Sequence, residues 1–206
     1  MFTGLIEEQG RIQQIRKNQH TIKLTCEASE AFLSDYRVGD SMAINGVCLT
    51  AVEKNQRSFT VDIMPATFQR TTFSTSKQNQ FVNLERAMKN NQRFEGHFVA
   101  GHVDGVTRLV NRREHENALV LVFAYPEKHH GEIIAQGSVA LNGVSLTVTT
   151  VGANTFSVGL IPHSKEQTNL GNLSIGTLVN VETDMIGKYL KAQGNKFHSF
   201  VKEGLL

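Results

Sequence analysis

The chain contains two copies of one sequence, and this duplication limits the folds open to it. Residues 41–88 align without a gap with residues 138–185, each position lying 97 further along in the second copy. Fifteen of these 48 positions are identical, where unrelated sequences would share roughly 3. The period is too long and the copies too few for a solenoid or propeller. We therefore expect domains at residues 1–95 and 96–184, with a tail at 185–206.

Each copy has the pattern of a β-domain. Residues 58–63 and 155–160 alternate apolar with polar or small side chains, which is typical of strands. We expect further strands at 21–26, 41–53 and 80–86, and at 118–124, 138–150 and 177–183. Asn45-Gly46 and Asn142-Gly143 fit a hairpin turn or a bulge in a bent strand equally well, because Asn and Gly tolerate positive φ. Many short strands favour small closed barrels, since closure removes exposed edges.

Helices are expected at three places. Pro65 and Pro162 mark the first residue of a short helix, where proline is tolerated. The tail predicts an amphipathic helix interrupted by Gly194. This helix would pack on its own domain or form the seam of a homo-oligomer. Its apolar residues at helical spacing are Ile186, Tyr189, Leu190, Phe197, Phe200, Val201 and Leu205.

Composition excludes several classes of protein. The formal net charge is +2, from 21 basic and 19 acidic residues, so no strong field directs the chain to nucleic acid or to a membrane. We find neither a secretory leader nor an apolar run of about 18 residues that would cross a bilayer. Two cysteines, Cys26 and Cys48, are too few for a disulfide framework. These features together predict a cytoplasmic protein.

The histidines offer several interpretations. His97 and His102 are five residues apart, which places them on opposite faces of an extended strand and argues against a shared metal ion. One of them would then be structural and the other exposed; alternatively, His102 lies in a cleft and moves a proton. His129 and His130 have charged neighbours and are expected in a solvated turn. We find no zinc ligand set.

Polar residues occupy matched positions in the two copies. Cys48 corresponds to Ser145, and Thr50 to Thr147. Cys48 is either a small core residue or a nucleophile, but matched threonines suit two related pockets that hydrogen-bond a heteroatom-rich ligand. Gly-rich phosphate loops, nucleophile elbows and paired-carboxylate signatures are missing. A cofactor-free reaction or simple ligand binding is therefore expected.

Several motifs together resemble one family. They are MFTG at the start, NGVCLT and GHFVAGHVDG in the first half, NGVSLTV and LIPH in the second, and DMIGKY before the tail. This combination, which reaches to about Tyr189, is similar to riboflavin synthases. The resemblance implies an all-β chain of two similar six-stranded antiparallel Greek-key barrels, plus a C-terminal α-helix through which homotrimers form.

The resemblance also implies a reaction. One molecule of 6,7-dimethyl-8-ribityllumazine would donate a four-carbon unit to a second, giving riboflavin and 5-amino-6-(D-ribitylamino)uracil, with no metal or organic cofactor. One lumazine would bind each barrel, and the productive pair would form between the first barrel of one subunit and the second barrel of its neighbour. Lumazine synthase is a further candidate partner.

Site residues follow from the same resemblance. His102 is the candidate proton shuttle, while Cys48, Thr50 and Ser145 are candidates for polarising a ring or delivering water. The catalytic candidates are Phe2, Ser41, Cys48, His97, His102 and Ser145. The first-barrel pocket would consist of Gly4, Leu5, Ile6, Cys48, Leu49, Thr50, Asp62, Ile63, Met64, Pro65, Ala66 and Thr67. The second would consist of Gln136, Asn142, Ser145, Leu146, Thr147, Ile161, Pro162, His163, Ser164, Lys165 and Glu166, with Gly101, His102 and Val103 reaching between the two.

Three positions depart from the family's usual pattern. Gln136 stands where the family usually has Lys, Asn142 where it has Asp, and Ala66 where it commonly has Glu. An amide can hydrogen-bond a pteridine edge, but it cannot act as a base at neutral pH. These changes keep open an alternative to the working enzyme, namely a non-catalytic fluorescent antenna protein that binds lumazine or flavin. A structural or generic binding module on the same fold is a third hypothesis.

Overall fold

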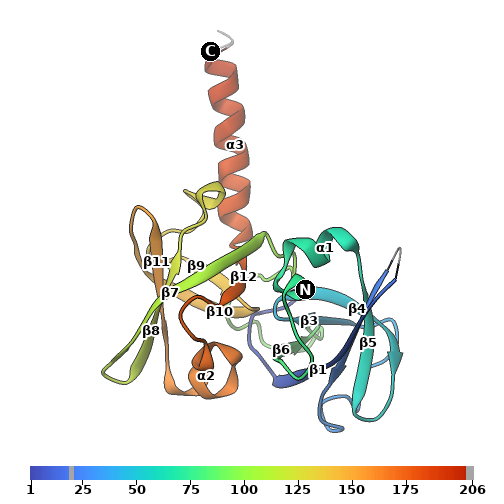
Figure 1. The fold of residues 1–206 in the computed structure, drawn as a ribbon. Helices are drawn as coiled ribbons and strands as arrows, with labels where there is room; N and C mark the ends of the chain where they lie inside the picture. Colours follow the sequence, from blue (N-terminus) through green and yellow to red (C-terminus); the bar gives the residue numbers. More distant parts are fainter. Residues whose placement is uncertain (19–20, 203–206) are drawn as a thin grey trace.

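The computed structural model, which describes residues 1–18 and 21–202, consists of two closed six-stranded antiparallel barrels and a C-terminal helix (Figure 1). The all-β prediction is confirmed. The first barrel has the strand order β1-β2-β5-β4-β3-β6. Its strands are β1 (Glu8–Lys17), β2 (Ile22–Glu27), β3 (Ser41–Ile44), β4 (Val47–Lys54), β5 (Ser58–Ile63) and β6 (Phe81–Arg86).

The second barrel repeats this arrangement, with the cyclic order β10-β11-β8-β7-β12-β9. Its strands are β7 (Gly105–His115), β8 (Ala118–Ala124), β9 (Ser138–Leu141), β10 (Val144–Val151), β11 (Thr155–Leu160) and β12 (Leu178–Thr183). The short helices α1 (Pro65–Arg70) and α2 (Pro162–Gln167) begin at the two prolines, as predicted. Single turns of 3-10 helix lie at η1 (Thr72–Ser74), η2 (Glu127–His129) and η3 (Asn169–Asn172).

The turns at Asn45 and Asn142 are hairpins. Ile44 pairs with Val47 across a two-residue turn in which Asn45 has φ 47° and Gly46 has φ 78°. Of the two interpretations of Asn45-Gly46 and Asn142-Gly143, the hairpin is confirmed and the bent strand is wrong, since 41–53 and 138–150 are each two strands joined by a tight turn. Two positive φ values twist such a turn in the sense that its strands require. The bulges lie further on, at 51–53 and 148–150.

Each barrel encloses its own apolar core. Alternation along β5 and β11 turns Phe59, Val61, Phe156 and Val158 inward, and each of them is at most 1% exposed. Burying one such side chain stabilises the fold by about 1.5–3 kcal/mol. The two cores are separate clusters, consistent with two folding units.

A third apolar cluster joins the barrels. Phe2 and Val99, 97 positions apart, exchange backbone hydrogen bonds of 2.9 and 3.2 Å and are fully buried. They pack with Ala43 and Ala140, which are also related by the repeat. A pseudo-two-fold axis therefore passes between the two segments, and both chain segments cross from one barrel to the other around it.

Four buried asparagines join the barrels elsewhere. Asn83 donates its side-chain N–H to the Asn142 carbonyl at 3.0 Å, and Asn180 donates to the Asn45 carbonyl at 2.8 Å. Asn45 and Asn142 also accept backbone N–H bonds through their side-chain oxygens, each of 2.8 Å. This symmetric seam satisfies amides that would otherwise be costly to bury.

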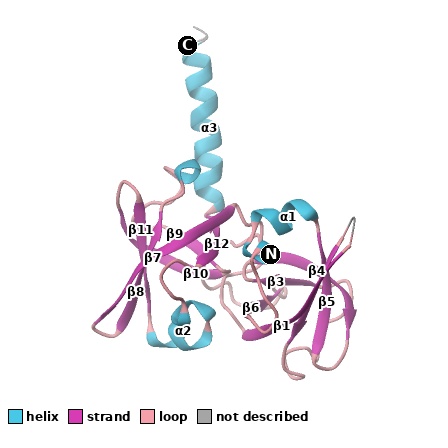
Figure 2. Cartoon of the chain, viewed as in Figure 1, coloured by secondary structure: helices cyan, strands magenta, loops and turns pink. Residues whose placement is uncertain are grey.

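The tail helix α3 (Met185–Lys202) begins on the second barrel and extends away from both (Figure 2). Asp184 caps it, because its carboxylate accepts the Ile186 N–H at 2.9 Å. Ile186, Tyr189 and Leu190 are exposed. The side chains of Phe197, Phe200 and Val201, and all of Leu205, lie outside the described part of the structure. Within that part, no helix is both long and apolar enough to cross a membrane.

The prediction of a solvated turn at His129 is wrong. His129 is buried, and its Nδ1 lies 2.8 Å from a carboxylate oxygen of Glu132. Glu132 also accepts from Thr183 and pairs with Lys191 of α3 at 2.8 Å. Burial alone would raise the pKa of Glu132, but hydrogen bonds from Lys191, His129 and Thr183 lower it to about 2. The charged neighbours of His129 therefore do not mark a solvated turn at this residue, because one of them, Glu132, holds His129 and Lys191 of α3 together.

We expect the Gly46→Ala variant to be markedly less stable than Gly39→Ala. Both glycines have positive φ, but a Cβ on Gly46 would lie 2.7 Å from the backbone nitrogen of Gly143, whereas Gly39 has open space. Gly39→Ala therefore costs about 1–2 kcal/mol of backbone strain, and Gly46→Ala about 1–3 kcal/mol more. Urea unfolding of the two variants measures the difference, and equal losses would contradict the close approach of the turns.

Candidate active site

A cavity of about 380 Å³ lies where the first barrel meets the segment that connects the barrels. One wall comes from β4 and α1, and the opposite wall from residues 101–104. A single residue of α3, Lys188, completes the lining. The lining residues are Val47, Cys48, Ala66, Thr67, Arg70, Thr71, Gly101, His102, Val103, Asp104 and Lys188.

Strand alternation directs Cys48 into this cavity. In β4, Val47, Leu49 and Ala51 are buried, so Cys48 and Thr50 point out of the barrel. The Cys48 N–H donates to the Gly101 carbonyl at 2.9 Å. A Cβ on Gly101 would lie 2.5 Å from the Cys48 Cβ, so this approach requires glycine. His102, the next residue, is exposed and lines the same cavity.

The second barrel has the matching contact. The Ser145 N–H donates to the Gly4 carbonyl at 2.8 Å, and a Cβ on Gly4 would lie 2.6 Å from the Ser145 Cβ. Gly4 and Ile6 therefore belong to the second barrel's site, and Gly101 and Val103 to the first. The assignment of residues 4–6 to the first-barrel pocket is wrong, because both segments cross over beside Phe2 and Val99.

His97 and Ser145 form a close pair. The Nδ1 of His97 lies 2.7 Å from the Ser145 hydroxyl oxygen, and the imidazole is buried. Burial lowers the pKa of His97, opposed by the charge of Asp184. Its Nε2 has no hydrogen-bond partner among the described residues. A neutral imidazole at this distance can accept the serine proton. His97 is thus the buried histidine of the two, and His102 the exposed one.

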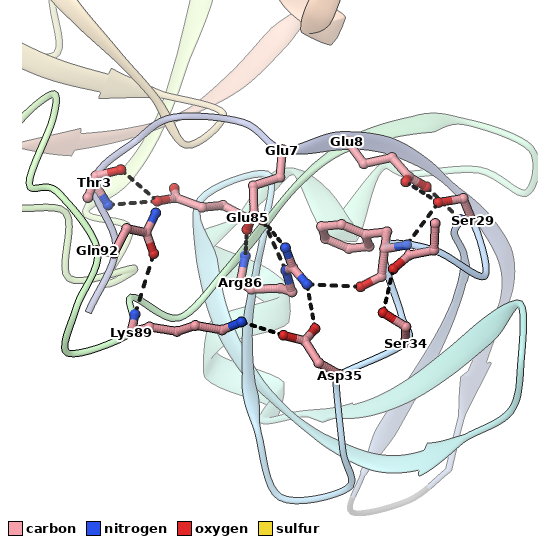
Figure 3. Close-up of polar contacts among 12 residues, drawn as sticks. Thr3, Glu7, Glu8, Ser29, Ser34, Asp35, Glu85, Arg86, Lys89 and Gln92 are labelled. Atoms are coloured by element: carbon pink, nitrogen blue, oxygen red, sulfur yellow. Dashed lines mark hydrogen bonds and ion pairs between the residues drawn. The ribbon is translucent and has the colours of Figure 1, made fainter.

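Two buried carboxylates hold the crossing segments in place. Glu85 of β6 accepts the Thr3 N–H at 2.7 Å (Figure 3). It also accepts the Gly4 N–H at 3.1 Å. Glu182 of β12, its counterpart in the repeat, accepts from Ala100 at 2.8 Å and Gly101 at 3.1 Å. Burial raises the pKa of Glu85 to about 7, although the bonds from Thr3 and Gly4 oppose the rise, and burial also raises the pKa of Glu182.

The remaining predicted site residues lie outside the lining of the cavity. Phe2 is fully buried between the barrels, Asn142 belongs to the asparagine seam, and Gln136 is exposed in the turn before β9 with φ 64°. The apolar strand residues Leu49, Ile63 and Leu146 belong to the barrel cores. On strand ends or outer surfaces, outside the lining of the cavity, lie Leu5, Ser41, Thr50, Asp62, Met64, Pro65, Thr147, Ile161, Pro162, His163, Ser164, Lys165 and Glu166.

Several residues of the site were not among those predicted from the sequence. Arg70, Asp104 and Lys188 line the cavity, Glu182 holds its wall at Gly101, and Glu85 holds Gly4 at the matching contact of the second barrel. Glu85 and Glu182 are identical residues at matched positions of the repeat, which was a usable signal. Asp104 lies in the GHFVAGHVDG motif and Lys188 in the DMIGKY motif. Arg70 had no such signal. Among the described residues, no group of three or more His, Cys, Asp and Glu side chains could hold a metal ion.

The class of protein is shown by a family match. The model of the lumazine binding domain matches residues 3–87 and again 100–184, so the chain is a protein of two lumazine-binding repeats. Riboflavin synthase of Bacillus subtilis is 40% identical over 100% of this chain and 98% of its own. Riboflavin synthase of Actinobacillus pleuropneumoniae is 42% identical over 93% of this chain and 88% of its own. The chain belongs to the riboflavin synthase family, the enzymes that form riboflavin.

Solved structures show the same fold. LumP complexed with 6,7-dimethyl-8-(1'-D-ribityl) lumazine has a TM-score of 0.81 and 27% identity, covering 89% of this chain and 99% of LumP. LumP complexed with riboflavin has a TM-score of 0.82 and 28% identity with the same coverage. The identity to LumP is lower than the 40–42% found for the two synthases.

We expect stability to fall as the pH rises from about 5 to about 7.5, and the Glu85→Gln variant to lose much of this dependence. Because the pKa of Glu85 is about 7 in the fold, against an ordinary value of 4.5, the folded state binds more protons across this range. Stability is therefore lost as the pH rises, by up to about 3 kcal/mol. Urea unfolding at both pH values measures it, and parallel profiles for the two proteins would contradict the assignment.

Proposed function

We propose that this chain converts two molecules of 6,7-dimethyl-8-ribityllumazine into riboflavin and 5-amino-6-(D-ribitylamino)uracil without a cofactor. The observation that carries the proposal is the matched pair of sites, in which Cys48 and Ser145 each meet a glycine of a crossing segment. A reaction between two identical molecules suits two related sites in one chain. Near-full-length identity to curated riboflavin synthases supports it.

The residues divide the chemistry between the two sites. A proton must leave the 7-methyl group of one lumazine, and the exposed imidazole of His102 is placed to receive it in the first-barrel cavity. At the other site, His97 accepts the Ser145 proton, so that the serine oxygen can add to the second ring or activate water. Stacking the two rings in register supplies a further part of the rate, in good cases about 7–11 kcal/mol.

The binding surface extends beyond the cavity in this proposal. Thr50 and Asp62 point outward from β4 and β5 beside it. Thr147 and the start of α2 offer the equivalent surface on the second barrel. Of the three departures from the family pattern, only Ala66 lines the cavity, whereas Gln136 and Asn142 do not.

The purified protein, mixed with lumazine and no added cofactor, tests the proposal through its absorption spectrum and product chromatography. We expect one riboflavin and one 5-amino-6-(D-ribitylamino)uracil for every two lumazines consumed. The structural likeness to lumazine-bound LumP makes a non-catalytic binding protein the second candidate. Tight binding with an unchanged spectrum over hours would favour it.

We expect His102→Gln and Cys48→Ser to lower kcat while leaving lumazine affinity within about threefold. Loss of a positioned proton acceptor costs about 10²–10⁴-fold, so His102→Gln should lie in that range. His115→Gln is the matched control, because His115 is exposed at the end of β7 and does not line the cavity. Parental kinetics in both site variants would show that the assigned roles are wrong.

The homotrimer also belongs to this proposal. Ile186, Tyr189 and Leu190 expose apolar surface on α3 at 64–69%, and such surface favours association. In the trimer, the first barrel of one subunit would face the second barrel of its neighbour. The domain division at residues 95 and 184, the cytoplasmic location and an association with lumazine synthase stay predictions.

Leu190→Glu should dissociate the trimer and lower turnover at the same protein concentration, because a buried unpaired charge is costly at an apolar interface. Gln193→Glu is the control, since it adds the same charge at an exposed polar position of α3. Sedimentation velocity and initial rates measure both effects. A fully active monomer would refute a site shared between subunits.

A further inference from the structure

The cavity wall formed by residues 101–104 is fixed at both ends. At one end, Gly101 accepts from Cys48 at 2.9 Å and donates to Glu182 at 3.1 Å. At the other, the Asp104 N–H donates to the Val181 carbonyl at 2.9 Å, and its carboxylate accepts the Thr183 N–H at 2.8 Å. The histidine between these ends thus depends on two anchors.

The second anchor includes the tail helix. Lys188 of α3 places its Nζ 2.7 Å from the same Asp104 oxygen that accepts from Thr183. The side chains of Lys188 and Asp104 are only 32% and 19% exposed, so solvent screens this pair less than a surface pair. Both residues line the cavity.

A second lysine of α3, Lys191, anchors the helix at a different place on the second barrel. Lys191 pairs with Glu132 at 2.8 Å and donates to the Lys128 carbonyl at 2.7 Å, and it does not line the cavity. The helix is thus tied to the second barrel by two lysines. Lys188 contacts Asp104 of the wall that carries His102 directly, whereas Lys191 reaches it only through intermediates, because Thr183 donates to both Glu132 and Asp104 and Lys128 donates to the Asp104 carbonyl. This arrangement provides a matched control on the same helix.

We propose that Lys188 is a positioning residue, which holds Asp104 and thereby keeps His102 in the cavity that Cys48 also lines, so that docking of α3 sets the geometry of the first-barrel site. The inference rests on the function proposed above. The imidazole of His102 has no hydrogen-bond partner within the described part of the chain, so its backbone anchors decide where it lies. Displacement of a reacting group by about 1 Å can cost about 10²-fold in rate.

Lys188→Met removes the charge and keeps most of the length of the side chain, and Lys191→Met is its control. Lys188→Met should lower kcat about tenfold, with KM for lumazine within twofold and the oligomeric state of the parent. Lys191→Met should stay within twofold in both constants, and Lys188→Arg should recover most of the rate. Asp104→Asn should cause a similar loss, and the double variant Asp104→Asn/Lys188→Met no further one.

Several results would overturn the proposal. Equal losses in the Lys188 and Lys191 variants would indicate general helix docking, and a raised KM at unchanged kcat would make Lys188 a substrate contact. Additive losses in the double variant would show that the two residues act separately. The ring NMR signal of His102 provides a readout independent of turnover: it should shift in Lys188→Met and not in Lys191→Met. An unshifted signal contradicts the inference, whereas absent turnover in the parent contradicts the proposed function.

Discussion

The antiparallel backbone pair between Phe2 and Val99 is the contact on which the rest of the structure depends. Because the two segments cross there, each barrel receives part of its site from the chain of the other. Gly101 reaches Cys48 on the first barrel, and Gly4 reaches Ser145 on the second. Neither barrel would have this site alone, so the duplication serves to complete two sites as well as to repeat a fold.

The crossing is stabilised by groups that are costly to bury. Glu85 and Glu182 satisfy the backbone N–H groups of the two crossing segments, and desolvation raises the pKa of each carboxyl group. In the asparagine seam, the side chains of Asn83 and Asn180 donate to the backbone carbonyls of the facing turns at Asn142 and Asn45. Removing one partner from such a network leaves an unpaired polar group, which typically costs about 1–3 kcal/mol. The two barrels are therefore fixed in orientation by polar groups as well as by the apolar cluster at Phe2.

Strands with buried alternating residues were predictable, and strands with few of them were not. Along β5 and β11, alternation identified the strands directly. In β1 and β7 most residues are polar and face solvent, with only Gly10 and Ile12 buried in β1, so periodicity had little signal there. The bent-strand interpretation of 41–53 and 138–150 is wrong because the apolar pattern runs through a two-residue turn, whose positive φ values reverse the chain without changing the pattern.

The sequence by itself determined the duplication, the β-class, the two short helices at Pro65 and Pro162, and the matched chemistry of Cys48 and Ser145, because each of these is local or repeated along the chain. The tertiary structure alone decided which barrel each crossing segment joins, that His97 is buried against Ser145, and that Lys188 meets Asp104 at the cavity. The His97–Ser145 and Lys188–Asp104 contacts join residues 48 and 84 positions apart, and the Gly4–Ser145 contact joins residues 141 positions apart. Only packing around the pseudo-two-fold axis brings such residues together, and no spacing along the chain encodes it.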